Sequence, residues 1–193
     1  RILKLHALPA AITAHALELL AELQLASFVF TADSIHSCQL GTRYHAYMQG
    51  WAETITAHHD VRGVVEPAAA VLLLAIGLEA DVGHAMRALA EHASLIDVTT
   101  FEAAGQHVLR VSPAGTSKGA ALAALATELG VARENVAVAG DYWNDLSMFA
   151  YAGRSLAMPH APDEVRRAAT HALDHDTTRP GAFADALAAW MDE

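Results

Sequence analysis

Apolar positions in the first part of the chain recur at helical spacing in two stretches, and other stretches have the composition of strands. Over residues 10–24 and again over 80–92 they recur at helical spacing, which predicts two amphipathic helices. Residues 27–30 are rich in β-forming side chains and predict a strand. Residues 71–76 form a continuous apolar run, which is typical of a fully buried strand.

The rest of the first part alternates less regularly. Residues 95–101 and 107–111 are separated by the glycine-containing stretch EAAGQ, and together they predict a β-hairpin. Residues 34–62 show no clear period, so no element is assigned there. Strands with two helices on one face indicate an α+β arrangement over residues 1–111.

After Pro113 the pattern changes to a regular alternation of helix and strand. A leucine-lined helix ends at Gly130, and the apolar run at 135–139 predicts a parallel strand covered on both sides. A helix from about Leu146, a strand at 155–158 and a helix opened by PDEVRRAA follow. This order predicts an α/β fold for residues 112–193, as part of a doubly wound, Rossmann-like parallel sheet. We therefore place a domain boundary near Ser112.

Composition and charge narrow the function classes. Hydrophobic residues make up 53% of the 193 residues, which predicts a sizeable core. The net charge of −10 argues against a nucleic acid or an anionic membrane surface as the main partner. The most apolar window, residues 68–78, is shorter than the roughly 20 residues of a membrane helix. One cysteine, Cys38, excludes an intrachain disulfide and fits a cytoplasmic location.

The stretch GDYWND, residues 140–145, places polar side chains where a buried strand ends. Ligands of open α/β sheets bind beyond the carboxyl ends of strands, and Asp141 lies there. Its carboxylate is the kind of oxygen ligand that Mg²⁺ takes, and Asn144 and Asp145 are placed to orient metal-bound water from outside the coordination sphere. The structural alternative is that Asp145 only caps the next helix.

The stretch TSKGAAL begins another helix with a cation. Thr116 or Ser117 is a suitable N-cap, and Lys118 then lies in the first turn. A cation is unfavourable at a helix N-terminus unless an anion lies nearby, so Lys118 indicates a phosphate site. The alternative is a solvated surface lysine. The order of residues is not that of a P-loop, because Gly119 follows the lysine.

Taken together, TSKGAAL, GDYWND and MFAYAGRSLAM resemble the C-terminal core half of the haloacid dehalogenase superfamily, and most closely its Cof-type phosphatases with a type-2 cap. The resemblance implies that Lys118 steadies the phosphate, that Asp141 ligates magnesium, and that Asn144 and Asp145 support substrate and metal-water contacts. It also implies that residues 1–111 are the cap domain. His160 stands where the family usually has asparagine.

One part of the family pattern is absent from the sequence. The family uses an aspartate nucleophile in a D-x-D-G motif, and no aspartate of this chain has that setting. In the family this motif precedes the cap, so we expect the nucleophile in a segment upstream of the printed residues. A core without that segment is expected to leave a strand edge exposed.

The resulting hypothesis is a magnesium-dependent hydrolase of small phosphate monoesters, such as sugar, nucleotide or cofactor phosphates, acting through an aspartyl-phosphate. Two alternatives stay open: an inactive relative that serves as a binding or structural protein, and a phosphomutase of the same superfamily. Cap residues Arg43, Tyr44 and Trp51 are candidate substrate contacts. The twelve histidines contain no zinc motif, and no oligomeric state is favoured.

Overall fold

The computed structural model describes residues 4–50, 52, 54–63, 65–103, 105–173 and 182–191 of the chain. It divides into two compact units, Arg1–Thr116 and Ser117–Glu193. Ser112 and Pro113 still belong to a strand of the first unit. The assignment of residues 1–111 as cap and 112–193 as core stays a prediction.

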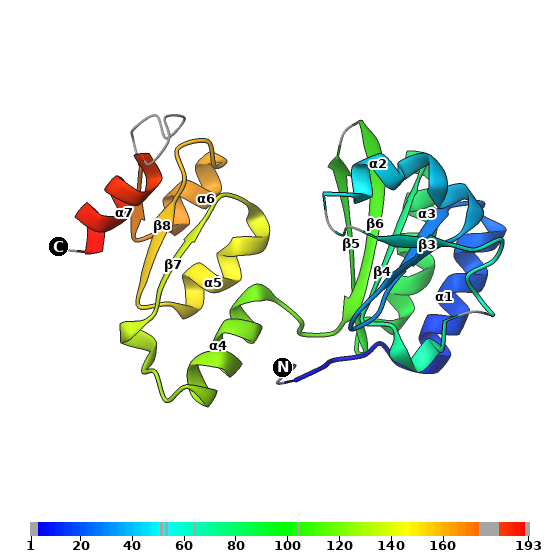
Figure 1. Cartoon of the computed structure of the whole chain (residues 1–193), viewed down its shortest axis with the longest axis horizontal. Helices are drawn as coiled ribbons and strands as arrows, with labels where there is room; N and C mark the ends of the chain where they lie inside the picture. The colour runs from blue at the N-terminus through cyan, green and yellow to red at the C-terminus, as the bar shows by residue number, and fades with distance from the viewer. Residues whose placement is uncertain are drawn as a thin grey trace. The chain divides into compact units, whose positions relative to one another are not determined.

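The first unit is built on a six-stranded sheet (Figure 1). Its strands are β1 (Ala26–Phe30), β2 (Ile35–Ser37), β3 (Ile55–Ala57), β4 (Leu72–Gly77), β5 (Ile96–Ala103) and β6 (Gln106–Pro113). The spatial order is β3-β2-β1-β4-β6-β5. Only the β2–β3 pair is parallel, and the other neighbours are antiparallel. The hairpin predicted from the sequence is β5–β6.

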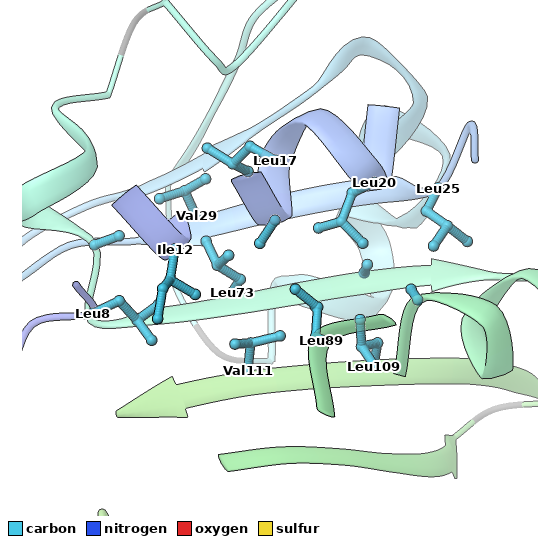
Figure 2. Packing of buried hydrophobic residues seen from close by; sticks show 14 of the residues in the cluster. Leu8, Ile12, Leu17, Leu20, Leu25, Val29, Leu73, Leu89, Leu109 and Val111 are labelled. Carbon is cyan, nitrogen blue, oxygen red and sulfur yellow. The ribbon is translucent and has the colours of Figure 1, made fainter. Parts of the chain in front are cut away.

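Helices α1 (Ala10–Glu22) and α3 (Glu79–Leu89) cover one face of this sheet. Figure 2 shows Leu17 and Leu20 of α1 beside Val29 and Leu73 of the sheet. Successive strand residues point to opposite faces. Accordingly Leu74 and the alternate residues Leu72 and Ile76 of β4 pack on the other face. The short elements η1 (Gln39–Tyr44) and α2 (His45–Met48) cover that face. The apolar run at 71–76 is thus buried on both faces.

The second unit has a three-stranded parallel sheet in the order β7-β8-β9. Its elements are α4 (Lys118–Glu128), β7 (Ala137–Gly140), α5 (Leu146–Tyr151), β8 (Arg154–Ala157), α6 (Asp163–Ala168), β9 (His171–Ala172) and α7 (Ala182–Met191). Phe149 of α5 and Val165 of α6 pack on one face of this sheet. Trp190 of α7 packs against Leu156 on the other face. The predicted α/β class is confirmed.

The burial of β7 differs from the sequence prediction. Its residues are half-buried or exposed, although the run NVAVA predicted a strand covered on both sides. Within the described residues β7 pairs only with β8, so it is an edge strand. An edge strand keeps one row of backbone groups unpaired and has fewer neighbours to cover its side chains. Among the described helices, none is long and apolar enough to cross a membrane.

Candidate active site

The candidate site is formed at the carboxyl end of β7. The strand ends at Gly140, and Asp141 follows it with an exposed carboxylate. A Cβ at position 140 would lie 2.5 Å from the Cβ of Asp145. Glycine is therefore required at position 140 for the Asp145 side chain to fold back against the end of the strand.

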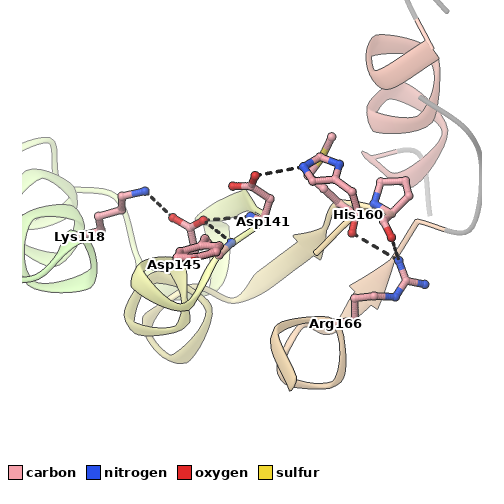
Figure 3. A network of polar contacts seen from close by, with 8 residues as sticks. Lys118, Asp141, Asp145, His160 and Arg166 are labelled. Carbon is pink, nitrogen blue, oxygen red and sulfur yellow. Dashed lines mark hydrogen bonds and ion pairs between the residues drawn. The ribbon is translucent and has the colours of Figure 1, made fainter. Parts of the chain in front are cut away.

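Asp145 is the buried centre of a hydrogen-bond network (Figure 3). Its Oδ1 accepts a hydrogen bond of 2.6 Å from the ammonium of Lys118. Its Oδ2 accepts from the backbone N–H groups of Asp141, at 2.9 Å, and Tyr142, at 3.1 Å. Burial by itself would raise the pKa of Asp145. The hydrogen bonds from Lys118 and the backbone outweigh that effect and hold this pKa below its ordinary value.

Lys118 is the first residue of α4, and local contacts fix the start of that helix. The Ser117 side chain is the N-cap and accepts a hydrogen bond of 3.1 Å from the backbone N–H of Ala120. The Gly119 N–H donates to the Ser147 hydroxyl of α5 at 3.0 Å, and a Cβ at position 119 would clash with the Ser147 carbonyl. The Lys118 side chain is still half exposed, so its ammonium can meet a ligand from solvent.

His160 joins the network from the segment that follows β8. Its Nε2–H donates to Oδ2 of Asp141 at 3.0 Å, and both side chains are exposed. Arg166 of α6 holds this segment, because its guanidinium donates to the carbonyls of Met158, Pro159 and Leu173. Figure 3 shows Lys118, Asp145, Asp141 and His160 in a row along these contacts. The His160 contact was missed by the sequence analysis, where only its departure from asparagine was a signal.

The other predicted site residues lie in different surroundings. Asn144 is exposed in the short element η5 (Trp143–Asp145), one residue before Asp145. In the first unit, Arg43 is exposed, whereas Tyr44 is half-buried against the apolar cluster around Leu74 and its hydroxyl donates to Gln106. Trp51 lies outside the described residues. Contacts of Asn144, Arg43 and Tyr44 with a substrate stay predictions.

The chemistry of the two aspartates fits a magnesium ion with Asp141 as its protein ligand. Asp141 presents an exposed carboxylate of the type that Mg²⁺ binds while it keeps several waters. Both oxygens of Asp145 are occupied by N–H donors, which fits a role outside the coordination sphere. In the described part of the chain, no three His, Cys, Asp or Glu side chains come together as a metal site. The remaining ligands would be water, substrate or groups outside the described residues.

Similarity to a known protein family extends over most of the chain. The family described as haloacid dehalogenase-like hydrolase matches residues 1–187. A 5-amino-6-(5-phospho-D-ribitylamino)uracil phosphatase, YwtE of Bacillus subtilis, is 41% identical over 66 residues, which are 34% of this chain and 23% of that protein. An HMP-PP phosphatase of Enterobacter sp. is 33% identical over 85 residues, covering 44% and 31% respectively. These matches span less than a third of either relative.

Solved structures show the same fold. A haloacid dehalogenase-like hydrolase from Bacteroides thetaiotaomicron aligns over 95% of this chain and 68% of its own, with a TM-score of 0.79 and 22% identity. A sugar phosphatase of haloacid dehalogenase subclass IIB aligns over 96% and 66%, with a TM-score of 0.70 and 16% identity. At these identities the likeness concerns the arrangement of the elements.

Proposed function

The chain belongs to the haloacid dehalogenase-like hydrolase family. From this membership we propose that it functions as a magnesium-dependent hydrolase of small phosphate monoesters. The observation that carries the proposal is the linked set Lys118, Asp145 and Asp141 at the carboxyl end of β7. It combines a half-exposed cation with an exposed carboxylate, which are the groups needed to hold a phosphate and a metal ion.

Each side chain has a distinct task in this proposal. Lys118 uses one of its three N–H donors on Asp145 and offers the others to the phosphoryl oxygens. Asp145 holds Lys118 in place and also fixes the backbone at Asp141. Asp141 would hold Mg²⁺, which offsets negative charge on the phosphoryl group when bound. Asn144, exposed beside Asp145, would contact the substrate.

The phosphoryl acceptor comes from outside the printed sequence in this proposal, because the sequence has no D-x-D-G motif. A carboxylate oxygen of that aspartate forms a bond to phosphorus while the ester P–O bond breaks, and the departing oxygen takes a proton. Water then hydrolyses the aspartyl-phosphate and releases phosphate. The half-buried strand β7 and the exposed Leu125 and Leu129 of α4 support the presence of further chain beside this unit.

The substrate is a small phosphorylated metabolite in this proposal. Three relatives carry the name 5-amino-6-(5-phospho-D-ribitylamino)uracil phosphatase. In the compound of that name, the phosphate is attached to a polyol that is joined to a uracil ring. The net charge of −10 gives no support to a nucleic-acid backbone as the ligand. Cys38 is the only cysteine, which supports a cytoplasmic location.

The test is phosphate release from p-nitrophenyl phosphate by the full-length protein, with and without Mg²⁺. We expect Asp141→Asn to lower the magnesium-dependent rate by about 100-fold or more, because it removes the proposed metal ligand. Asp163→Asn is the matched control, since Asp163 is an exposed aspartate of α6 in the same unit. An unchanged rate in Asp141→Asn would show that the metal assignment is wrong.

A further inference from the structure

Two large aromatic side chains are exposed directly after the proposed metal ligand. Tyr142 is 45% exposed and Trp143 is 46% exposed. Their rings meet edge to face, with centroids 4.7 Å apart. Aromatic rings usually bury most of their surface, so two exposed rings side by side need a reason. The hydrophobic clusters in the described part of the second unit include neither residue. We call Tyr142 and Trp143 the aromatic pair.

The aromatic pair is held in place by polar contacts. The indole Nε1–H of Trp143 donates to Oε2 of Glu164, at 3.3 Å, in the first turn of α6. The backbone N–H of Tyr142 donates to the buried carboxylate of Asp145. The Trp143 indole is thus held at its Nε1, the Tyr142 backbone is held by Asp145, and the two rings contact each other edge to face. A fixed aromatic surface loses little conformational entropy when a ligand binds to it.

The aromatic pair lies at the same end of the sheet as the proposed phosphate site. The Asp141 carboxylate contacts His160, and the Trp143 indole contacts Glu164. Residues 160–164 form one short segment after β8, so both side chains border the same piece of chain. The backbone at Tyr142 and the ammonium of Lys118 also share one partner, the Asp145 carboxylate.

We propose that the aromatic pair stacks against a planar heteroaromatic ring in the part of the substrate that leaves when the phosphate is removed. This rests on the proposed function and adds a substrate class to it: phosphate esters that carry a ring such as a pyrimidine, in preference to plain sugar phosphates. Bases stack on exposed aromatic side chains through their π faces, whereas a sugar or polyol has no such face. The Glu164 carboxylate beside Trp143 favours a ring without negative charge of its own.

The experiment compares two substrates that share a phosphorylated ribose and differ in the ring, uridine 5′-monophosphate and ribose 5-phosphate. The ratio of their kcat/KM values is measured in the full-length protein, so that a loss of activity that affects both substrates equally cancels. We expect Trp143→Ala to lower the ratio about tenfold, the scale of losing one aromatic stacking partner. Trp143→Phe should keep most of it. Leu78→Ala, which removes an exposed apolar side chain of the first unit, should leave the ratio unchanged.

A second measurement separates this inference from the proposed function. Binding of uridine 5′-monophosphate is followed by equilibrium dialysis in the same variants. If neither ester is hydrolysed but Trp143→Ala weakens binding about tenfold and Trp143→Phe does not, the phosphatase function fails and the stacking site stands. The stacking role is refuted if Trp143→Ala changes neither the kcat/KM ratio nor the binding, or if it lowers kcat/KM equally for the two substrates. Any hydrolysis observed in that case still supports the phosphatase function.

Discussion

The ammonium of Lys118 lies 2.6 Å from Oδ1 of Asp145, a carboxylate whose side chain is only 3% exposed. The two residues are 27 positions apart and come from different elements, the start of α4 and the end of η5. A buried carboxylate needs hydrogen-bond donors, because an unpaired buried charge is costly. Lys118 therefore stabilises the site and, in the proposed function, also binds the phosphoryl group.

Lys118→Ala is expected to lower the free energy of unfolding by about 1–3 kcal/mol at pH 7, because it leaves Asp145 with only its two backbone donors. The half-exposed lysine keeps this cost below that of breaking a fully buried pair. The measurement is urea unfolding of the full-length protein. The double variant Lys118→Ala/Asp145→Asn should recover stability, since the amide carries no charge.

The control for this prediction is Lys4→Ala, which removes an exposed lysine of the first unit and should have almost no effect. Additive losses in the double variant would contradict the view that the buried charge of Asp145 causes the destabilisation.

His160→Ala is expected to weaken Mg²⁺ binding by about 10–100-fold, the usual effect of removing a partner of a metal ligand. The imidazole N–H holds Oδ2 of Asp141 at 3.0 Å and so fixes the orientation of the carboxylate. His160→Asn keeps a donor and should bind more tightly than His160→Ala. Calorimetric titration of the full-length protein with MgCl₂ gives the dissociation constants. His171→Ala, an exposed histidine of β9, is the control, and equal affinity in all the variants would exclude this role.

Sequence patterns predicted the long elements of both units. The helix expected at 10–24 is α1, and the apolar run at 71–76 is β4, since both are long enough for their period to show. Residues 34–62 contain β2 and β3, which have three residues each, and two short helical elements. Strands this short have too few positions for alternation to be detected, and only pairing with β1 and β2 defines them.

The candidate site was predictable to the extent that motifs encode it. GDYWND and TSKG identified Asp141, Asp145 and Lys118, and the structure joins these three residues in one network, with Asp141 linked to Asp145 through its backbone N–H. Their catalytic and metal-binding roles stay predictions. The contact of His160 with Asp141 depends on how the segment after β8 returns to the end of β7. No local pattern specifies that return, which Arg166 secures through three carbonyl groups.

Asp60→Asn is expected to cause a small loss of stability that depends on pH. The side-chain and backbone N–H groups of Arg62 hydrogen-bond to the Asp60 carboxylate and lower its pKa to about 2. Because this pKa is lowered in the folded state, the ionised carboxylate stabilises that state above about pH 4, the ordinary pKa of the group. This stabilisation is lost as the pH falls through about 2. Because both side chains are more than 40% exposed, solvent keeps the effect small at every pH.

Thermal unfolding of Asp60→Asn and of the unaltered protein, compared from pH 7 to pH 2, tests this dependence. The difference between the two should be full at pH 7, shrink below about pH 4 and disappear as the pH falls through about 2. Arg62→Gln should reproduce the pH 7 loss, since it removes the same pair. A difference that stays constant down to pH 2 would assign the effect to something other than ionisation of Asp60.

Gly119→Ala is expected to destabilise the second unit by about 1–3 kcal/mol, although alanine is by itself the better helix former by about 1 kcal/mol. The added Cβ would clash with the Ser147 carbonyl, so α4 must move away from α5 and lose the hydrogen bond to the Ser147 hydroxyl. That movement also shifts Lys118, the preceding residue. Gly63→Ala is the control, because no heavy atom beyond its two chain neighbours lies within 4 Å of its Cβ position. If urea unfolding gave the two variants equal stability, the close approach of α4 to α5 would not constrain residue 119.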